Sequence, residues 1–557
     1  MVYSLWKVNV RGLSAAGKIV KNTGDMMSSE REQKKQTRKS VMGLVILLIA
    51  GLAALGGVVF LLSDRRPPGV TMDSYDREGE YSGQEKAGKA GAGDSGQQNV
   101  QSGGEDVNSE ASGQAAWEQS ALAQSERTES GQADTGQADI GETEHKGEGT
   151  ALTPEQQALL AEADRLAAGY DYDGAMSLIE SCESFSEIPQ MAEALVRYEN
   201  EKAATVRYSS ITQITHVFYH SLIVDTSLAF DGDEDAASYN RVMTTVEEFQ
   251  KIMEEMYNRG YVLVSMHDMA HIEVQADGTE VMVAGDIYLP PGKIPYVLSL
   301  DDMSYYHYME GDGFADRVIL DKNGKVTCEY TQADGTVITG AFDVVPLVDA
   351  FVEEHPDGAY RGARGVVALT GYNGVLGYRT DPAYQTGSGL DASQWAWLSA
   401  HPDFNYEREC ADARAVAEAM RANGWEFACH SYGHLNYKTA SYEDFVWDVN
   451  TWKNTVEPIV GETDIVIYAF GADISDWHPY TAENEKYRYL KNMGFDYFCN
   501  VDSSQYWVQL GSDFLRQGRR NLDGIRMWEA ISGGTDRVSD LFDAASVFDT
   551  DRPTPVR

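Results

Sequence analysis

From about residue 209 to residue 557, short apolar runs alternate with amphipathic helical patterns, and this alternation is the strongest constraint on the fold. The predicted strands are 214–219, 261–265, 296–300, 365–370, 425–429 and 464–470, and the predicted helices are 246–258, 344–354, 411–423, 442–460 and 483–493. Strands and helices that alternate in this way form parallel strands joined by crossover helices, in a sheet or a barrel. In barrels, the chemistry lies at the carboxyl ends of the strands. We therefore predict an α/β domain over residues 208–557 and search the strand ends for a site.

Residues 41–62 form an uncharged apolar run of about 22 residues, which is long enough as a helix to cross a bilayer core of ~30 Å. Five basic residues precede this run, at positions 31, 34, 35, 38 and 39, and an acidic stretch follows it. The positive-inside rule then predicts a cytoplasmic segment 1–40, a transmembrane helix 41–62 and an extracellular remainder. A cleaved signal peptide would have a shorter apolar region and a small-residue cleavage site. We expect an uncleaved, single-pass anchor in the cell membrane.

The segment that follows the predicted anchor changes twice in composition. Residues 63–150 are rich in Gly, Ser, Gln, Glu and Asp and poor in aliphatic clusters, so they cannot bury enough apolar surface to offset chain entropy. We predict a disordered acidic linker there. Residues 151–207 begin with a Thr-Pro helix start at Thr153 and carry apolar residues at helical spacing. This part is predicted to be a helical neck that packs on the domain after it.

The charge balance excludes one class of partner. The chain has 45 Lys and Arg against 87 Asp and Glu, for a formal net charge of −42. Nucleic-acid binding needs a basic surface, because most of its affinity comes from phosphate contacts. We expect no nucleic-acid partner.

Acidic and histidine pairs follow two of the predicted strands. Asp301 and Asp302 come directly after strand 296–300, and His430 and His434 come after strand 425–429. One carboxylate and two imidazoles make a metal site with open positions, suited to zinc or a similar divalent ion. The remaining carboxylate can act as a base on water. Together these groups predict metal-assisted hydrolysis.

Spacing alone is weak evidence, because the chain has two further HxxxH pairs. These are His216 with His220, and His267 with His271. We interpret both pairs as structural, as buried histidines with hydrogen-bond partners or as surface residues. The acidic pair and the His430–His434 pair differ in that each follows a strand.

Six short segments share an order and spacing with a known family: 219–222 (YHSL), 260–265 (GYVLVS), 299–302 (SLDD), 424–434 (GWEFACHSYGH), 468–471 (YAFG) and 494–497 (GFDY). They resemble the YHS, GYxxVS, TFDD, GxExxxHSxxH, YPFG and GFDY segments of polysaccharide deacetylases with the NodB homology domain. The resemblance covers roughly residues 209–540. It implies a distorted (β/α) barrel with Asp301 as the catalytic base and Asp302, His430 and His434 as the metal ligands.

The same resemblance implies a reaction and a substrate. The reaction is removal of an acetyl group, N-linked or O-linked, from a cell-wall or surface glycan that contains N-acetylglucosamine units. A further histidine, from a late L-x-H segment, would protonate the leaving amine, but we cannot place that segment. His478 is the candidate for this acid, directly after a stretch at 473–477 that is similar to the family's D-x-x-D-W.

The chain also departs from the family pattern. Met303 replaces a glycine after the acidic pair, and Ala469 replaces the proline of YPFG. Residues 305–364 are extra sequence with two predicted hairpin turns, at 322–324 and 333–335. These departures leave open an alternative function, a catalytically inactive module that binds glycan. A third hypothesis, a structural spacer or adhesin, does not account for the Asp and His residues.

Overall fold

The computed structural model of the protein describes residues 152–557. The predicted cytoplasmic segment 1–40, transmembrane helix 41–62 and linker 63–150 lie outside the described residues. Across residues 152–557 the structure contains no helix long and apolar enough to cross a lipid bilayer.

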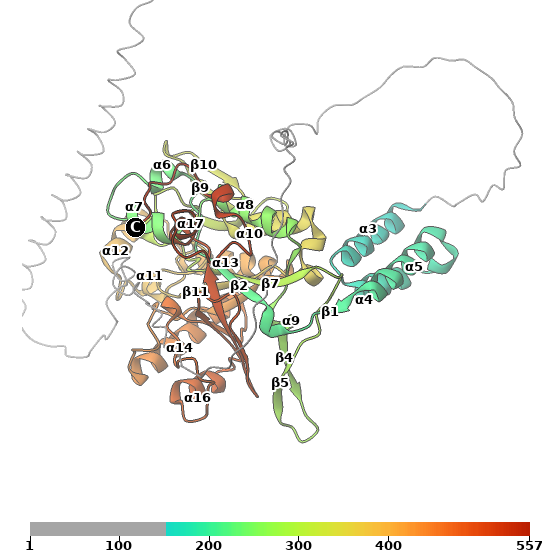
Figure 1. The fold of residues 1–557 in the computed structure, drawn as a ribbon. Helices are drawn as coiled ribbons and strands as arrows, with labels where there is room; N and C mark the ends of the chain where they lie inside the picture. The colour runs from blue at the N-terminus through green and yellow to red at the C-terminus, as the bar shows by residue number, and fades with distance from the viewer. Residues whose placement is uncertain (1–151) are drawn as a thin grey trace, which may run out of the picture. The chain divides into compact units, whose positions relative to one another are not determined.

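Seven parallel strands form a closed ring, which confirms the predicted barrel (Figure 1). They follow the order β2 (Thr215–Tyr219), β7 (Ile294–Asp301), β11 (Val366–Leu369), β12 (Glu426–Cys429), β13 (Ile465–Ile467), β14 (Tyr497–Val501) and β16 (Leu515–Asn521). The ring closes because β16 also pairs with β2. The short β3 (Tyr261–Leu263) pairs with the amino-terminal half of β7, and β15 (Val508–Leu510) pairs antiparallel with β16. All seven carboxyl ends therefore meet at one end of the barrel.

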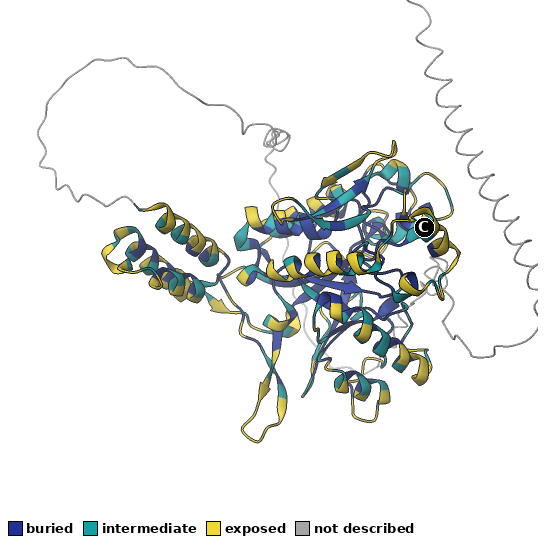
Figure 2. Ribbon diagram, turned by 180° about the vertical axis from the view of Figure 1, so that it is seen from behind, coloured by how far each residue is buried: buried dark blue, intermediate teal, exposed yellow. Residues whose placement is uncertain are grey.

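Amphipathic helices cover the outside of the ring, so that the strands are buried and the outer helix faces are exposed (Figure 2). The main ones are α8 (Val246–Asn258), α10 (Val344–Glu354), α13 (Tyr406–Ala422), α14 (Tyr442–Thr455), α15 (Glu457–Val460), α16 (Glu485–Asn492), α17 (Gly524–Ile531) and α18 (Ala544–Val547). The predicted bounds of α8 and α10 are confirmed. The prediction of one continuous helix over 442–460 was wrong. The observed helix α14 ends before Val456, and the short helix α15 follows. Pro458 lies in the first turn of α15, where its missing N–H costs no helical hydrogen bond.

Three helices precede the barrel, at the place of the predicted neck: α3 (Pro154–Ala168), α4 (Tyr172–Glu180) and α5 (Pro189–Ala204). Thr153 caps α3 in a reciprocal capping box with Gln156, as its sequence suggests. The helices pack on the rest of the chain: Tyr170 donates its hydroxyl to the carbonyl of Asp357 at 2.7 Å, and the backbone N–H of Arg361 donates to Gly169 at 2.7 Å. The neck is thus attached to the barrel by hydrogen bonds as well as by apolar contact.

The extra sequence after β7 forms a separate three-stranded antiparallel sheet. Its strands are β8 (Arg317–Leu320), β9 (Val326–Thr331) and β10 (Val337–Gly340), and the two predicted hairpin turns connect them. Other elements were not predicted: the hairpin β4 (Ala270–Val274) with β5 (Glu280–Ala284), the pair β1 (Val206–Arg207) with β6 (Tyr288–Leu289), and the helices α6 (Thr226–Ala229), α7 (Ala236–Val242), α9 (Met266–Met269), α11 (Pro382–Thr386) and α12 (Ala392–Ala400).

One of the HxxxH pairs lies at the opposite, amino-terminal end of the barrel. His267 hydrogen-bonds through Nδ1 to Glu426, at the start of β12, and through Nε2 to Asp464 at 3.0 Å, just before β13. His271 is exposed on β4. The pair is therefore structural, as interpreted from the sequence. Burial lowers the pKa of His267, but the hydrogen bonds and charges of Asp464 and Glu426 outweigh it and raise the pKa to about 10.

This shift predicts that the protein loses stability on the alkaline side. Between the ordinary histidine pKa and the raised value, the folded state holds a proton that the unfolded state has released. The stabilisation by His267 is therefore full below about pH 6.5 and is lost as the pH rises towards 10. We expect urea unfolding at pH 6 and pH 9.5 to differ less in His267→Gln than in the parent protein. An equal pH dependence in both would contradict the assignment.

Candidate active site

The barrel brings the four residues predicted to form the site to one end. Asp301 is the last residue of β7 and Asp302 follows it, while His430 follows β12 directly. One donor atom each from Asp302, His430 and His434 lie within 4.8 Å of one another. Oδ2 of Asp302 is 3.9 Å from Nε2 of His430 and 3.5 Å from Nε2 of His434.

This arrangement fits a divalent metal ion. Donors bound to a tetrahedral zinc ion at about 2.0–2.1 Å stand about 3.4 Å apart, close to the spacing found between Asp302 and the two histidines. Nδ1 of His430 donates to the carbonyl of Ile467 at 2.8 Å, which turns Nε2 towards Asp302. Such a hydrogen bond on the far nitrogen is typical of metal-bound histidine. The three residues form an N₂O donor set with room for further ligands.

The protonation states suit metal binding. Burial lowers the pKa of His434 to about 4, so its ring is neutral at neutral pH. Burial raises the pKa of Asp302, but the neighbouring His434 and His430 outweigh it and hold that pKa below its ordinary value. A neutral imidazole and an ionised carboxylate are the forms that bind a cation.

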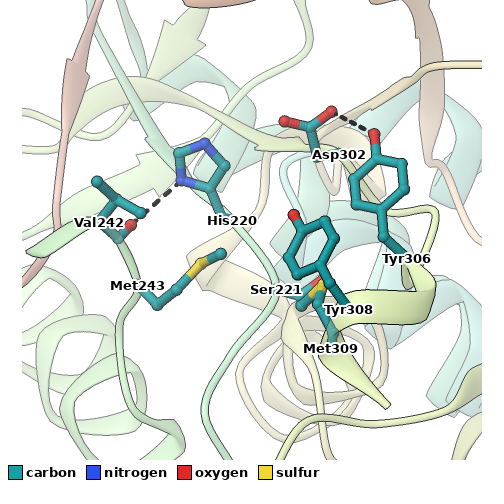
Figure 3. Close-up of a pocket in the computed structure, with 8 residues that line it drawn as sticks. All are labelled: His220, Ser221, Val242, Met243, Asp302, Tyr306, Tyr308 and Met309. Carbon is teal, nitrogen blue, oxygen red and sulfur yellow. Dashed lines mark hydrogen bonds between the residues drawn. The ribbon is translucent and has the colours of Figure 1, made fainter. Parts of the chain in front are cut away.

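A tyrosine from the extra sequence orients Asp302. The hydroxyl of Tyr306 donates to Oδ1 of Asp302 at 2.8 Å (Figure 3). The same hydroxyl lies 2.7 Å from the hydroxyl of Thr370. The Tyr306 ring stacks between Tyr308 and Tyr372, at centroid distances of 5.5 and 5.0 Å. Because Oδ1 is held by Tyr306, Oδ2 is the oxygen that faces the two histidines.

A buried carboxylate on α14 holds the loop that carries the histidines. Asp448 accepts hydrogen bonds from the backbone N–H of Tyr432 and of Gly433, both at 2.8 Å. It also accepts from the hydroxyls of Ser431 at 3.0 Å and Tyr437 at 2.7 Å. Four donors on one carboxylate fix the turn between His430 and His434. Asp448 is not among the residues predicted from the sequence.

Residues with a left-handed backbone gather around the site. Asp302, Tyr305, Ser431, His434 and Phe470 have φ between 49° and 64°, although none is glycine. Each such conformation costs on the order of 1–3 kcal/mol and persists only where the surrounding structure imposes it. Their concentration at one end of the barrel is typical of a functional site.

Asp301 is held by an arginine that the sequence analysis missed. Arg519, on β16, donates to Oδ1 at 2.7 Å and to Oδ2 at 2.8 Å, and both side chains are buried. Burial raises the pKa of Asp301, but the charge of Arg519 outweighs it and lowers that pKa below its ordinary value. Asp301 is therefore ionised at neutral pH. No local pattern links Arg519 to Asp301, because the contact depends on the pairing of β16 with β2.

His220 also lies at this end of the barrel, directly after β2. It lines the pocket that contains Asp302, and the other lining residues are Ser221, Val242, Met243, Tyr306, Tyr308 and Met309 (Figure 3). Nδ1 of His220 donates to the carbonyl of Val242 at 3.2 Å, which orients the ring. The structural interpretation of the His216–His220 pair was therefore wrong in placing His220 outside the site. Its position at a strand end could have identified it.

His478 lies outside this pocket. Its side chain is 58% exposed, stacks on Trp477 and pairs with Asp476. Asp473, the first residue of the D-x-x-D-W-like stretch, pairs with Arg516 at 2.8 Å. The structure therefore does not bring the sequence-based candidate acid to the metal ligands.

The last residues of the chain secure one wall of the pocket. Arg552 pairs with Glu248 through two bonds of 2.6 Å, and both side chains are fully buried. Its guanidinium also donates to the carbonyls of Asn240 at 2.8 Å and Met243 at 2.6 Å. These bonds fix the backbone on both sides of Val242, whose carbonyl orients His220.

We expect His430→Ala to lose bound metal. The change removes one of the three donor residues. The two that remain, Asp302 and His434, are too few to bind a cation firmly. Elemental analysis of the purified protein should show less than about a tenth of the parent's metal content, since even partners of ligands change affinity by about 10–100-fold. His478→Ala is the matched control. Equal metal loss in both variants would contradict the assigned ligands.

No family model matches the sequence, and no curated protein is significantly similar to it. Among solved structures, the chain is similar to the Streptococcus pyogenes deacetylase PplD in complex with acetate, at 11% identity over 57% of this chain and 92% of that one, with a TM-score of 0.29. It is also similar to a polysaccharide deacetylase from Bacillus cereus, at 10% identity over 60% and 69% of the two chains, with a TM-score of 0.29.

Both of these structural neighbours are deacetylases. The closed ring of seven parallel strands fits the barrel that the motif resemblance implies for polysaccharide deacetylases with the NodB homology domain.

Proposed function

We propose that this protein is a metal-dependent hydrolase that removes acetyl groups from a glycan containing N-acetylglucosamine. The observation that supports it best is the combination, at one end of the barrel, of an Asp/His/His donor set with a separate carboxylate held by a buried arginine. Such a pairing lets one carboxylate bind the metal while the other takes part in proton transfer, a combination suited to metal-assisted hydrolysis of an amide.

The chain's own residues then have distinct roles. Asp302, His430 and His434 would hold the cation, for which zinc suits the donor set. When bound, the cation would act as a Lewis acid that polarises the acetamide carbonyl. Asp301, ionised and fixed by Arg519, accepts the proton of the attacking water. His220, whose ring is oriented by the carbonyl of Val242, protonates the departing amine.

If His220 is the acid, the effect of its substitution on kcat should depend on the leaving group of the substrate. Amines leave only after protonation, whereas p-nitrophenolate leaves without it. We expect His220→Asn to lower kcat on an N-acetylglucosamine oligomer by about 10²–10³-fold, and on p-nitrophenyl acetate by less than about 3-fold. His478→Asn should affect neither substrate. Equal losses of His220→Asn on both substrates would exclude His220 as the acid.

We further propose that residues 41–62 anchor the enzyme in the cell membrane with the barrel outside. The apolar run and its basic flank support this orientation. Added protease should digest the barrel in intact cells. Protection of the barrel until the cells are lysed would refute the orientation.

Acetate release by the full-length protein tests the function directly. The panel should contain N-acetylglucosamine oligomers, peptidoglycan, poly-N-acetylglucosamine and an O-acetylated glycan, with metal content measured in the same preparation. Release from at least one glycan, abolished in His430→Ala, supports the proposal. Glycan binding without acetate release would instead favour the inactive binding module.

A further inference from the structure

A continuous chain of buried polar side chains runs up the inside of the barrel beneath Asp301. It consists of Gln517 and Arg519 on β16, His216 on β2 and Ser299 on β7, all at most 1% exposed. None of them belongs to the metal ligands or to the pocket lining. Burial of apolar side chains in the barrel would cost less free energy, because each buried polar group needs a hydrogen-bond partner.

When the His216 ring is neutral, the hydrogen bonds between these side chains have only one direction. The amide nitrogen of Gln517 donates to the carbonyl of Ile214 at 3.0 Å, so its oxygen faces Nδ1 of His216 at 3.1 Å and accepts from it. His216 is therefore protonated at Nδ1, and Nε2 accepts from the hydroxyl of Ser299 at 3.0 Å. The Ser299 hydrogen is thereby committed to His216.

Because the Ser299 hydroxyl donates its hydrogen to His216, its oxygen can accept a hydrogen bond from Arg519. Nη1 of Arg519 donates to Oγ of Ser299 at 3.0 Å and to Oδ1 of Asp301 at 2.7 Å. One face of the guanidinium is covered by the Phe218 ring, whose centroid lies 4.3 Å from Cζ of Arg519. Ser299 is therefore the second acceptor that fixes the rotation of the guanidinium, and with it the plane of the Asp301 carboxylate.

The arrangement works only with a neutral His216. A protonated ring would present N–H groups to both neighbours and force the Ser299 hydrogen towards Arg519. Burial, followed by the charge of Arg519, holds the pKa of His216 well below its ordinary value. The ring is therefore an acceptor throughout the neutral range.

We propose that His216 is a positioning residue, which acts through Ser299 and Arg519 to orient the carboxylate of Asp301. This role rests on the proposed function of Asp301 as the base. The positioning role adds a function to His216, which the sequence analysis interprets only as a structural histidine.

Substitution of Ser299 tests the proposal in the full chain. We expect Ser299→Ala to lower kcat on an acetylated glucosamine oligomer by about 10–100-fold, as a base displaced by about 1 Å would, with KM and metal content unchanged. Ser299→Thr keeps the hydroxyl and should stay within about 3-fold of the parent. The matched control is Cys499→Ala, since that thiol contacts Nδ1 of His216 at 3.9 Å but makes no hydrogen bond to Ser299 or Arg519, the two residues through which His216 would act.

The outcomes separate this proposal from the proposed function. Unchanged kcat in Ser299→Ala, or an equal loss in Cys499→Ala, would overturn the positioning role while leaving the enzyme assignment intact. If the parent releases no acetate, the proposed function fails, and a crystal structure of Ser299→Ala then decides: a rotated Arg519 supports the positioning role and an unmoved one refutes it.

Discussion

Replacing Asp301 with asparagine is expected to lower kcat by about 10²–10⁴-fold, the share of a rate that a general base usually contributes. Asparagine cannot accept a proton from water, while the three metal donors remain in place. The metal content of Asp301→Asn should therefore equal that of the parent. Acetate release and elemental analysis on one preparation measure both quantities, and undiminished turnover would remove Asp301 from the mechanism.

The same variant has a structural cost that must be controlled. Arg519 is buried and would lose the charge that compensates it, so Asp301→Asn should also unfold at lower urea concentration. The double variant Asp301→Asn with Arg519→Gln carries no buried charge at this position. We expect it to recover stability without recovering turnover, and recovery of both would show that the loss came from misfolding.

Removing Arg552 is expected to have the largest effect on stability. Breaking a buried ion pair from one side costs about 3–5 kcal/mol, because the partner is left buried and uncompensated. Glu248 would be that partner, and the carbonyls of Asn240 and Met243 would lose their donor as well. Urea unfolding of Arg552→Ala should show this loss.

A surface pair provides the control. Arg165 and Glu162 are each about half exposed, so Arg165→Ala should change the free energy of unfolding by at most about 1 kcal/mol. A similarly small change in the free energy of unfolding of Arg552→Ala would contradict the stabilising role assigned to the Arg552–Glu248 ion pair. Because these bonds also fix Val242, we expect the surviving folded fraction of Arg552→Ala to lose activity.

Local sequence patterns are sufficient to predict the elements that build the barrel. Apolar runs and helical spacing locate most of the ring strands, and α8 and α10 have the predicted bounds. The rule that chemistry lies at strand ends leads to Asp301, Asp302, His430 and His434. These residues are close in sequence to the strands that carry them, so a local pattern contains the information.

The partners of these residues are beyond the reach of local patterns. Arg519 meets Asp301 only because the last strand of the ring pairs with the first one, which in turn pairs with β7. Asp448 reaches the histidine loop from the facing side of α14 and looks like an ordinary helix residue in the sequence. Such contacts depend on ring closure and helix rotation, neither of which has a signature within a short window.

Closure of the ring also sets the order in which the chain can be completed. The bonds between β2 and β16 join segments roughly 300 residues apart, and at about 5–20 residues per second synthesis of that interval takes about 15–60 s. For this time one edge of β2 has no partner strand from the ring, although β7 can already cover its other edge. An open strand edge invites pairing with other chains. A nascent chain of this protein therefore needs protection of β2 until β16 has been made.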